Sequence, residues 1–311
     1  MIRGPIPSGA PVFVFTDPGI DDALALAMMA SSSRPRMIGA CGVDGNVPSR
    51  LASANLAGLL RLFGAGDIPV FQSAVNDPVH EYPVHVHGRN GLGNIKIVKP
   101  RSPRGQALPL VDFLKSRGNF QILSLGPLTA LSDLLKKSPN IAAQISRCVI
   151  MGGGIVRGNV THYAEFNIHS NPDAADDIFH SAIPKILVPL DVTEKVKLYP
   201  EDRKELQRSG RLAAGMLAGM LQFYFNFQKK ENGFYGGYMH DPSAVVAMTN
   251  PELFEFRRAE VRVDTTGRRT RGRTTASFSR NGHANTWITT GVKAEAVRSV
   301  IMEKLLGHRS D

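Results

Sequence analysis

Three aspartates within six residues are the part of the sequence best suited to chemistry. Asp17 precedes a Pro-Gly pair, and Asp21 and Asp22 follow it. Like charges this close raise one another's pKa unless a cation or hydrogen-bond donors keep them ionised. A hard divalent cation removes that repulsion, and ligands that are all oxygen favour calcium or magnesium over zinc. The spacing therefore predicts a site for such a cation.

Other interpretations of these aspartates exist. Asp21 and Asp22 also suit the first turn of a helix, where aspartate caps free N–H groups and meets the positive end of the helix dipole. That alternative leaves Asp17 unexplained. An EF-hand loop is excluded because the Pro-Gly-Ile sequence interrupts its alternating oxygen ligands. A phosphoryl-transfer D-x-D nucleophile is excluded because Phe15 occupies the position of its first aspartate.

Further polar groups follow other apolar runs. Asn46 lies in a small polar turn after the run 37–43, and the carboxyl edge of a parallel sheet is where such turns meet ligands. The stretch 158–167 is the most polar of the chain. It offers the mixed donors and acceptors that the hydroxyl groups of a sugar need, from Asn159, Glu165 and Asn167.

Two stretches with histidines each have two interpretations. Residues 85–93, which include His87, form either a functional loop or lid, or an ordinary surface loop with solvated histidines. His240 and Asp241 precede a helix expected over 243–248, where they form either a functional pair or a simple cap beside a surface histidine. On these residues alone, the surface loop and the cap are the simpler explanations.

The elements that must position these groups alternate between strand and helix. Apolar runs predict strands over 12–15, 37–43, 68–71, 120–125, 147–151 and 185–189. Helices are predicted from Asp21 onward, over 51–63, up to Lys137, over 172–179, across most of 198–230 and over 243–248. Strands over 259–263 and 284–288 are expected to form a hairpin before a closing helix over 292–306. This pattern favours one α/β domain over residues 1–311, with a mainly parallel, doubly wound, Rossmann-like sheet flanked by helices.

Composition limits the class of protein. Of the 311 residues, 42% are hydrophobic and 21% are charged, which is ordinary for a soluble globular protein. Cys41 and Cys148 lie in apolar runs, which favours buried free thiols and a reducing cytoplasm. The N-terminal residues lack an apolar signal core, and no run approaches the roughly 20 apolar residues of a membrane span. We therefore expect a cytoplasmic protein with no membrane partner.

The net charge of +10 raises the question of nucleic-acid binding. The densest basic run, residues 268–273, has no interleaved aromatic side chains on which bases could stack. A solvated turn or hairpin loop is the simpler interpretation of this run. We therefore expect no nucleic-acid partner, and expect the charge to serve solubility or a subunit contact.

Taken together, the motifs resemble those of the inosine-uridine-preferring nucleoside hydrolases, also called nucleoside N-ribohydrolases. Eight pieces match in the family's order: TDPGIDDALAL, GN at 45–46, HGRNGLG, LGPLT at 125–129, IMGGG, GN at 158–159, EFN at 165–167 and HDP at 240–242. One such motif would be weak, but eight in order make chance a poor explanation. The resemblance implies that the chain is a single nucleoside hydrolase domain and that it assembles as a homodimer or homotetramer. It also implies the reaction, which is hydrolysis of the N-glycosidic bond of ribonucleosides to free base and ribose.

The resemblance also implies roles for individual residues. One calcium ion would be held by Asp17, Asp22, Asp241 and the backbone carbonyl of Leu125. Asp17 would also take the proton of the attacking water. His240 would protonate the departing base, which a histidine near its ordinary pKa of about 6.5 can do at neutral pH. The nucleoside would be bound at the positions that match the family's ribose and base contacts: Asp21, Asn46, His87, Met151, Asn159, Glu165, Phe166, Asn167 and Asp241.

Three positions depart from the family's pattern. Phe15 stands where most members have the first Asp of D-x-D-P-G, Ala130 replaces the Asn after GPLT, and Asn171 replaces the Asp before the next proline. Phe15 is expected to change the groups around the metal and hence its affinity. A histidine rather than an indole at position 240 favours the branches that are broad in specificity or accept pyrimidines. Two alternatives stay beside this function: hydrolysis of another riboside, and a catalytically weak ribose-binding protein.

Overall fold

One large sheet organises the part of the chain that the structure describes. The structure is a computed structural model, and it describes residues 9–75, 81–99, 108–278, 284 and 286–307. Within these ranges, nine strands pair in the order β10-β9-β11-β6-β5-β4-β1-β2-β3. The first six along the chain are β1 Val12–Thr16, β2 Met37–Gly42, β3 Val70–Gln72, β4 Phe120–Ser124, β5 Ile145–Met151 and β6 Lys185–Val188.

The order of these six strands marks the place where a doubly wound sheet forms its crevice. They pair in parallel as β3-β2-β1-β4-β5-β6, so the chain builds outward from β1 in one direction and then returns to β4 to build in the other. In such doubly wound sheets, ligands bind outside the carboxyl ends of the strands where the direction reverses. Here that point lies between β1 and β4, and the loops after these two strands carry Asp17 and Leu125.

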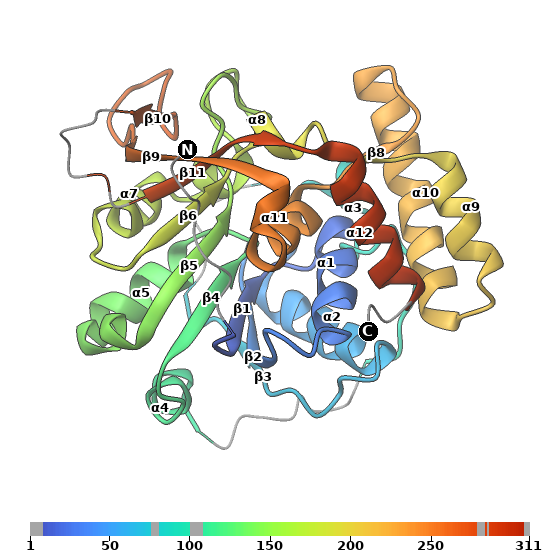
Figure 1. The fold of residues 1–311 in the computed structure, drawn as a ribbon, viewed down its shortest axis with the longest axis horizontal. Helices are drawn as coiled ribbons and strands as arrows, with labels where there is room; N and C mark the ends of the chain where they lie inside the picture. The colour runs from blue at the N-terminus through green and yellow to red at the C-terminus, as the bar shows by residue number, and fades with distance from the viewer. Residues whose placement is uncertain (1–8, 76–80, 100–107, 279–283, 285, 308–311) are drawn as a thin grey trace.

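Hydrophobic residues cover both faces of the sheet. Side chains of β1 alternate between the faces, so Val12 and Val14 belong to one core cluster and Phe13 and Phe15 to the other. Figure 1 shows the helices on either side of the strands. The first cluster is completed by α1 Ile20–Ala30, α2 Ser49–Leu62, α10 Leu212–Asn232, α11 His240–Thr249 and α12 Ala294–Leu306. The second is completed by α4 Leu110–Lys115, α5 Thr129–Lys137 and α7 Pro172–His180.

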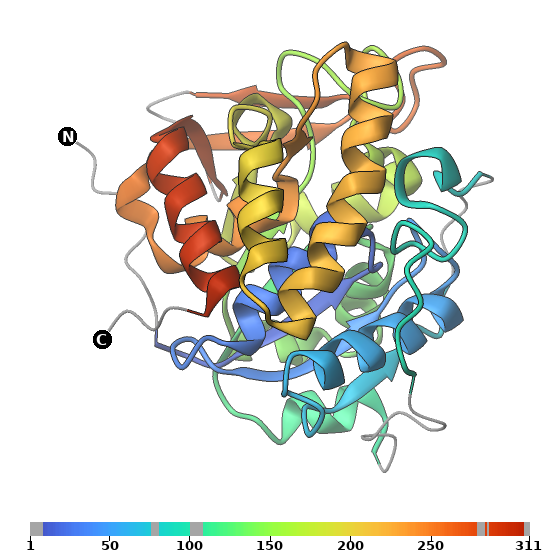
Figure 2. The same cartoon turned by 90° about the vertical axis from the view of Figure 1, so that its right-hand side faces the viewer.

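Short elements and one helix pair complete the described chain. The helix α9 Pro200–Arg208 lies beside α10, and Figure 2 shows the two side by side. The two-stranded sheet of β7 Lys197–Leu198 and β8 Gly237–Tyr238 joins the segments before and after this pair. The remaining short helices are α3 Val84–His87, α6 Phe166–Ser170, α8 Leu190–Thr193, η1 Pro139–Gln144 and η2 Pro251–Leu253.

The predicted C-terminal hairpin is wrong in its connection. Strands β9 Phe254–Val263 and β11 Thr286–Val292 do pair in antiparallel fashion. However, β10 Thr274–Ser277 lies between them in the chain and pairs with the other edge of β9. The true hairpin is β9-β10. A four-residue strand of small polar residues has too little apolar alternation to be recognised in the sequence.

The basic run forms the turn of this β9-β10 hairpin, as predicted. Arg271 forms an ion pair of 2.5 Å with Asp173 on α7, and the guanidinium of Arg273 lies 5.3 Å from the centre of the Tyr163 ring. Arg273 also forms a backbone bridge with Ala164. The basic run therefore contacts the polar stretch 158–167 through Arg273.

The other predictions of fold have clear outcomes. The mainly parallel, doubly wound α/β class is confirmed, and Cys41 and Cys148 are buried free thiols. Among the described residues, no helix has the length and apolarity that crossing a bilayer requires. The N-terminal residues 1–8 lie outside the described residues, so the extent of the domain over 1–311 stays a prediction.

Candidate active site

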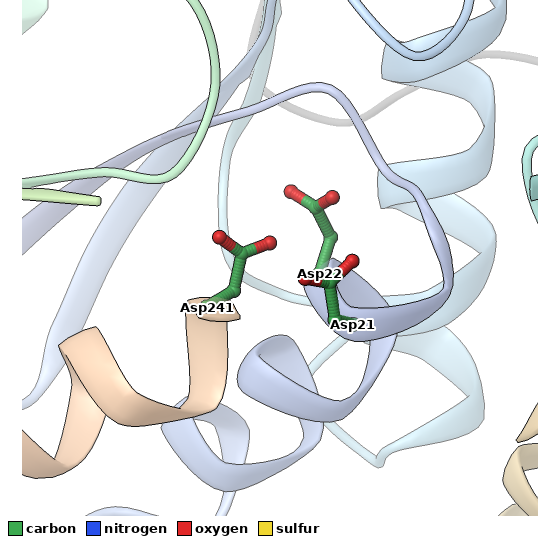
Figure 3. A group of neighbouring side chains, drawn as sticks. All are labelled: Asp21, Asp22 and Asp241. Atoms are coloured by element: carbon green, nitrogen blue, oxygen red, sulfur yellow. The ribbon is translucent and has the colours of Figure 1, made fainter. Parts of the chain in front are cut away.

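A buried group of carboxylates lies at the crevice between β1 and β4. Asp21 and Asp22 come from the first turn of α1, and Asp241 comes from the first turn of α11. These three side chains bring one oxygen each within 4.8 Å of one another. Figure 3 shows the three carboxyl groups rising from the ends of the two helices toward the same space. Asp17, directly after β1, is also buried, and its charge adds to burial and to the charges of Asp22 and Asp21 in raising the pKa of Asp241.

The turn between Asp17 and α1 requires a glycine. A Cβ atom at Gly19 would lie 2.6 Å from Nδ2 of Asn46 and 2.8 Å from Nδ1 of His87. The missing side chain therefore lets both polar groups reach the start of α1. The motif brings together residues that are far apart in sequence.

Asp22 has two roles at once. Its Oδ2 accepts hydrogen bonds from the backbone N–H of Gly19 at 2.8 Å and from Nδ2 of Asn46 at 3.3 Å. Its Oδ1 accepts from the hydroxyl of Thr16. The helix-cap interpretation is therefore correct for Asp22, and it does not compete with membership of the carboxylate group.

Asp17 has one oxygen that is bonded and one that is not. Its Oδ2 accepts from the backbone N–H of Asn46 at 2.6 Å. Its Oδ1 is buried and has no hydrogen-bond partner among the described residues. A Cβ atom at either Gly45 or Gly126 would overlap this carboxylate. Two glycines from different loops therefore leave space for it.

Burial and mutual repulsion change the acidity of the group. Burial, and then the charge of Asp22, raises the pKa of Asp17 well above its usual 3.8. The same causes raise the pKa of Asp21 to about 7, and burial with the charges of its three neighbours raises that of Asp241. Without a counter-charge, the group therefore keeps protons to a higher pH than ordinary carboxyl groups do, and Asp21 is partly protonated at neutral pH. Its all-oxygen donors and the unpartnered Oδ1 of Asp17 fit a hard divalent cation.

Crowding of Asp17 is a direct test of this fit. If the group binds a divalent cation, Gly126→Ala should weaken that binding, measured with calcium, by about tenfold or more, which is about 1.4 kcal/mol, because the added methyl group displaces the Asp17 carboxylate. Isothermal titration calorimetry measures this affinity. Gly215→Ala is the matched control, since it lies within α10 with no atom near the new methyl group. Unchanged calcium affinity in Gly126→Ala would contradict a role for Asp17 in binding the cation.

The loop after β4 presents a backbone carbonyl to the same crevice. The N–H of Leu125 donates to the carbonyl of Phe15 at 2.8 Å, and the carbonyl of Leu125 accepts from Nδ2 of Asn167 at 2.8 Å. The Phe15 ring itself lies in the core, with its centre 5.2 Å from that of Phe13. Phe15 therefore contacts the site through its backbone carbonyl, which accepts the hydrogen bond from Leu125.

Side chains of the polar stretch 158–167 fix its conformation through hydrogen bonds within the stretch and to residues after β5. Glu165 caps α6, because Oε1 accepts from the N–H of Asn167 at 2.9 Å and Oε2 accepts from the N–H of Ile168 at 3.2 Å. Oε2 also accepts from the N–H of Gly153, after β5, at 2.7 Å. Asn167 is buried, and its Nδ2 also donates to the carbonyl of Met151 at 3.2 Å. Asn159 is exposed, and its Oδ1 accepts from the N–H of the half-buried Phe166 at 3.0 Å. The structure thus brings Glu165, Asn167 and Met151 together and leaves Asn159 at the rim.

The loop with His87 is not a solvated surface loop. His87 is buried, and its Nδ1 accepts from the N–H of Ile20, the first residue of α1, at 3.1 Å. Burial, with the nearby rings of His240 and His85, lowers the pKa of His87 to about 3. Its ring stacks on that of Tyr224, with centres 6.2 Å apart. The surface-loop interpretation holds for the exposed His85 alone.

His240 departs from its expected state. It is half-buried, and its Nδ1 lies 2.8 Å from Oγ1 of Thr193. Burial lowers its pKa to about 4, so the expectation of an ordinary pKa near 6.5 is wrong. A ring with this pKa is neutral at pH 7. The interpretation of His240 as a surface histidine beside a cap is also wrong.

Several contacts of the site are not foreseen from the sequence. The contact of Thr193 with His240 is the clearest case, because Thr193 lies in the short helix α8. Elements this short have no periodicity. The contact between Thr16 and Asp22 could have been predicted, because Thr16 directly precedes Asp17 in the motif that also contains Asp22.

Comparison with known proteins gives a consistent result. The chain matches the sequence model of the family described as "Inosine-uridine preferring nucleoside hydrolase" over residues 12–299. It is 33% identical to uridine nucleosidase 1 of Arabidopsis thaliana, with 82% of this chain and 79% of the relative covered. It is 34% identical to the pyrimidine-specific ribonucleoside hydrolase RihA of Salmonella typhi, with 86% and 88% covered.

Solved structures show the same likeness. The plant nucleoside hydrolase PpNRh1 superposes with a TM-score of 0.87 at 30% identity, over 96% of this chain and 99% of that chain. A purine-preferring ribonucleoside hydrolase from Gardnerella vaginalis superposes with a TM-score of 0.89 at 29% identity, over 96% and 98%.

Proposed function

The chain belongs to the inosine-uridine preferring nucleoside hydrolase family, and from this premise we propose that it hydrolyses uridine- and inosine-type ribonucleosides with the help of calcium. The products are the free base and ribose. The observation that carries the proposal is the buried carboxylate group at the crevice between β1 and β4, in which Asp17 keeps one oxygen without a partner.

We propose that calcium is held by Asp17, Asp22, Asp241 and the carbonyl of Leu125. Asp22 and Asp241 belong to the three carboxylates whose oxygens approach within 4.8 Å, and the third of these is Asp21 rather than Asp17. The unpartnered Oδ1 supports the inclusion of Asp17. A bound cation would keep the group ionised, orient sugar hydroxyls and lower the pKa of a water molecule.

Asp17 then accepts the proton of the attacking water. Its Oδ2 is fixed by the N–H of Asn46, which leaves Oδ1 to face the water. As the water oxygen bonds to the anomeric carbon of the ribose, the bond from that carbon to the base nitrogen breaks. The electron pair leaves with the base, and the water proton passes to Asp17.

The ribose is bound by polar side chains around the carboxylates. The proposed set is Asp21, Asn46, Asn159, Glu165, Asn167 and Asp241, with Met151 beside the sugar. Glu165 and Asn167 are already fixed by backbone contacts, so they are oriented before the substrate arrives. Negative charge near the anomeric carbon stabilises the positive charge that develops there.

The base lies near His87, Phe166 and His240 in this proposal, and His240 assists its departure. Nδ1 of His240 is engaged with Thr193, so in this proposal the neutral ring carries its proton on Nε2 and donates a hydrogen bond from there to the departing base. We expect His240→Ala to lower kcat for inosine and uridine by about a hundredfold or more, the usual contribution of a positioned acid. A nitrophenyl riboside, whose leaving group needs no proton, should lose far less.

The control for this substitution is His180→Ala, which removes an exposed histidine on α7. It should leave both substrates unaffected. Equal losses for inosine and for the nitrophenyl riboside in His240→Ala would refute the proposed role, because a group that assists the leaving base must be sensitive to that base.

A panel of uridine, cytidine, inosine and adenosine tests the substrate class. We expect the fastest ribose release from uridine and cytidine, because the relatives at 33% and 34% identity are a uridine nucleosidase and a pyrimidine-specific hydrolase. Faster release from inosine and adenosine would contradict this preference. Tight nucleoside binding without any release would support a ribose-binding protein instead.

The assembly is proposed from the family alone, and the location is proposed from the buried free thiols of Cys41 and Cys148, which suit a reducing compartment. We propose a homodimer or homotetramer in the cytoplasm, with no nucleic-acid partner. Light scattering of the purified protein tests the assembly, and a monomer would refute it.

A further inference from the structure

Thr193 is a buried hydroxyl that faces His240. It is fully buried at the end of α8, and its Oγ1 lies 2.8 Å from Nδ1 of His240. Among the described residues, Thr193 is the hydrogen-bond partner found for this ring. We propose that Thr193 is a positioning residue that sets the orientation of His240, an inference that rests on the role of His240 proposed above.

The helix that carries Thr193 is fixed to the loop after β5. The N–H of Leu190 donates to the carbonyl of Gly153 at 2.9 Å. The carboxylate of Asp191 accepts from the N–H groups of Ile155 and Val156 at 2.7 and 3.0 Å. Because α8 is short, these contacts at its first two residues fix the place of Thr193 as well.

The segment that carries His240 is fixed to the same region. The N–H of Met239 donates to the carbonyl of Val196 at 3.0 Å, and Lys197 pairs with Tyr238 in the β7-β8 sheet. The backbone just after Thr193 is therefore bonded to the backbone just before His240. The distance between the hydroxyl and the ring is set by main-chain structure on both sides.

The chemistry of the hydroxyl suits this position. A threonine hydroxyl both donates and accepts a hydrogen bond, so it can bond Nδ1 whether or not that nitrogen carries a proton. The ring then keeps Nε2 directed away from Thr193 throughout the proton transfer. Without the hydroxyl, Nδ1 loses its partner and the ring is free to turn over. Partners that orient a functional histidine in this way typically matter by about tenfold to a hundredfold.

The experiment compares two substitutions of Thr193 on two substrates. Thr193→Val, which keeps the shape but removes the hydroxyl, should lower kcat for uridine by about tenfold to a hundredfold. KM should change little, and the rate on a nitrophenyl riboside should be nearly that of the native enzyme. Thr193→Ser, which restores the hydroxyl, should recover most of the uridine rate.

The matched control is Thr289→Val, which removes another buried threonine hydroxyl, in β11, that donates to the carbonyl of Leu187 at 3.4 Å. It should leave the rates on both substrates unchanged. The double variant with His240→Ala should be no slower than His240→Ala alone, because Thr193 acts only through that ring.

Three results would overturn the inference. A native uridine rate in Thr193→Val would show that the hydroxyl is not needed, and equal losses on both substrates would show a purely structural role. An equally slow Thr193→Ser would exclude the hydroxyl as the cause. These results differ from the result expected if the proposed function is wrong, because the native enzyme itself would then release no ribose from uridine.

Discussion

Asp17→Asn should lower kcat for uridine by about a thousandfold or more and should raise the melting temperature of the metal-free protein. An asparagine oxygen can still accept the hydrogen bond from the N–H of Asn46. It cannot accept the proton of water, and a loss of this size corresponds to about 4 kcal/mol of activation free energy. The free energy of unfolding should rise because burial and the charge of Asp22 both disfavour the ionised form of Asp17, and asparagine carries no charge.

The control for this prediction is Asp173→Asn, which removes an exposed carboxylate that pairs with Arg271. Exposed ion pairs of this kind contribute about 0–1 kcal/mol, so neither activity nor melting temperature should change noticeably. Steady-state kinetics and calorimetry give both readouts. A Asp17→Asn enzyme with a rate near the native one would remove Asp17 from the mechanism. A less stable metal-free protein would contradict the account of its burial.

Removal of the metal should abolish turnover and reverse the usual dependence of stability on pH. The pKa of Asp21 is raised to about 7, and the pKa values of Asp17 and Asp241 are also raised. The folded metal-free protein thus holds protons that the unfolded chain releases above its ordinary carboxyl pKa of about 3.9. Its free energy of unfolding should fall as pH rises from about 4 through 7.

Calcium should counteract this loss. Because cation binding displaces the protons, calcium should raise the melting temperature more at pH 8 than at pH 5. At a calcium concentration about 1,000 times the Kd, the stabilisation is about 4 kcal/mol. Scanning calorimetry over this pH range, with calcium and with chelator, measures the effect. Asp21→Asn should make the pH dependence of the metal-free protein shallower.

Two results would contradict this prediction. A melting temperature at pH 8 that does not respond to calcium would mean that the carboxylate group is not the cation site. Full turnover after chelation would mean that hydrolysis does not depend on a bound cation.

Much of the fold could be predicted because long elements carry a period. The buried run of β1 and the apolar spacing of α2 are visible in the sequence, and the structure places both where they are expected. The short elements α6 and α8 have five and four residues, which is too few for helical spacing to show. The hairpin prediction failed for a different reason, since β10 has the sequence TTAS and so lacks the apolar residues by which the equally short β6 was recognised.

The candidate site could be predicted only in part. Asp17, Asp21 and Asp22 signal a cation site by their spacing, but nothing local shows that Asp241 joins them, and resemblance to a family was needed for that. The state of His240 was mispredicted because burial, which lowers its pKa to about 4, is a property of the folded chain.

Contacts between residues far apart in the chain also could not be predicted from the sequence. The bond from Ile20 to His87 and the bond from the N–H of Gly153 to Glu165 join groups whose approach depends on how the loops pack. The glycines at 45 and 126 show the same limit. Both stand in recognisable motifs, yet only the structure shows that they leave space for one carboxylate.

The most direct test of the central claim is the release of ribose and uracil from uridine by the purified protein, followed before chelation, after chelation and after calcium is returned. We predict equal amounts of the two products, loss of the reaction on chelation and recovery with calcium. Absence of both products while calcium is bound would contradict the claim that this carboxylate group hydrolyses ribonucleosides.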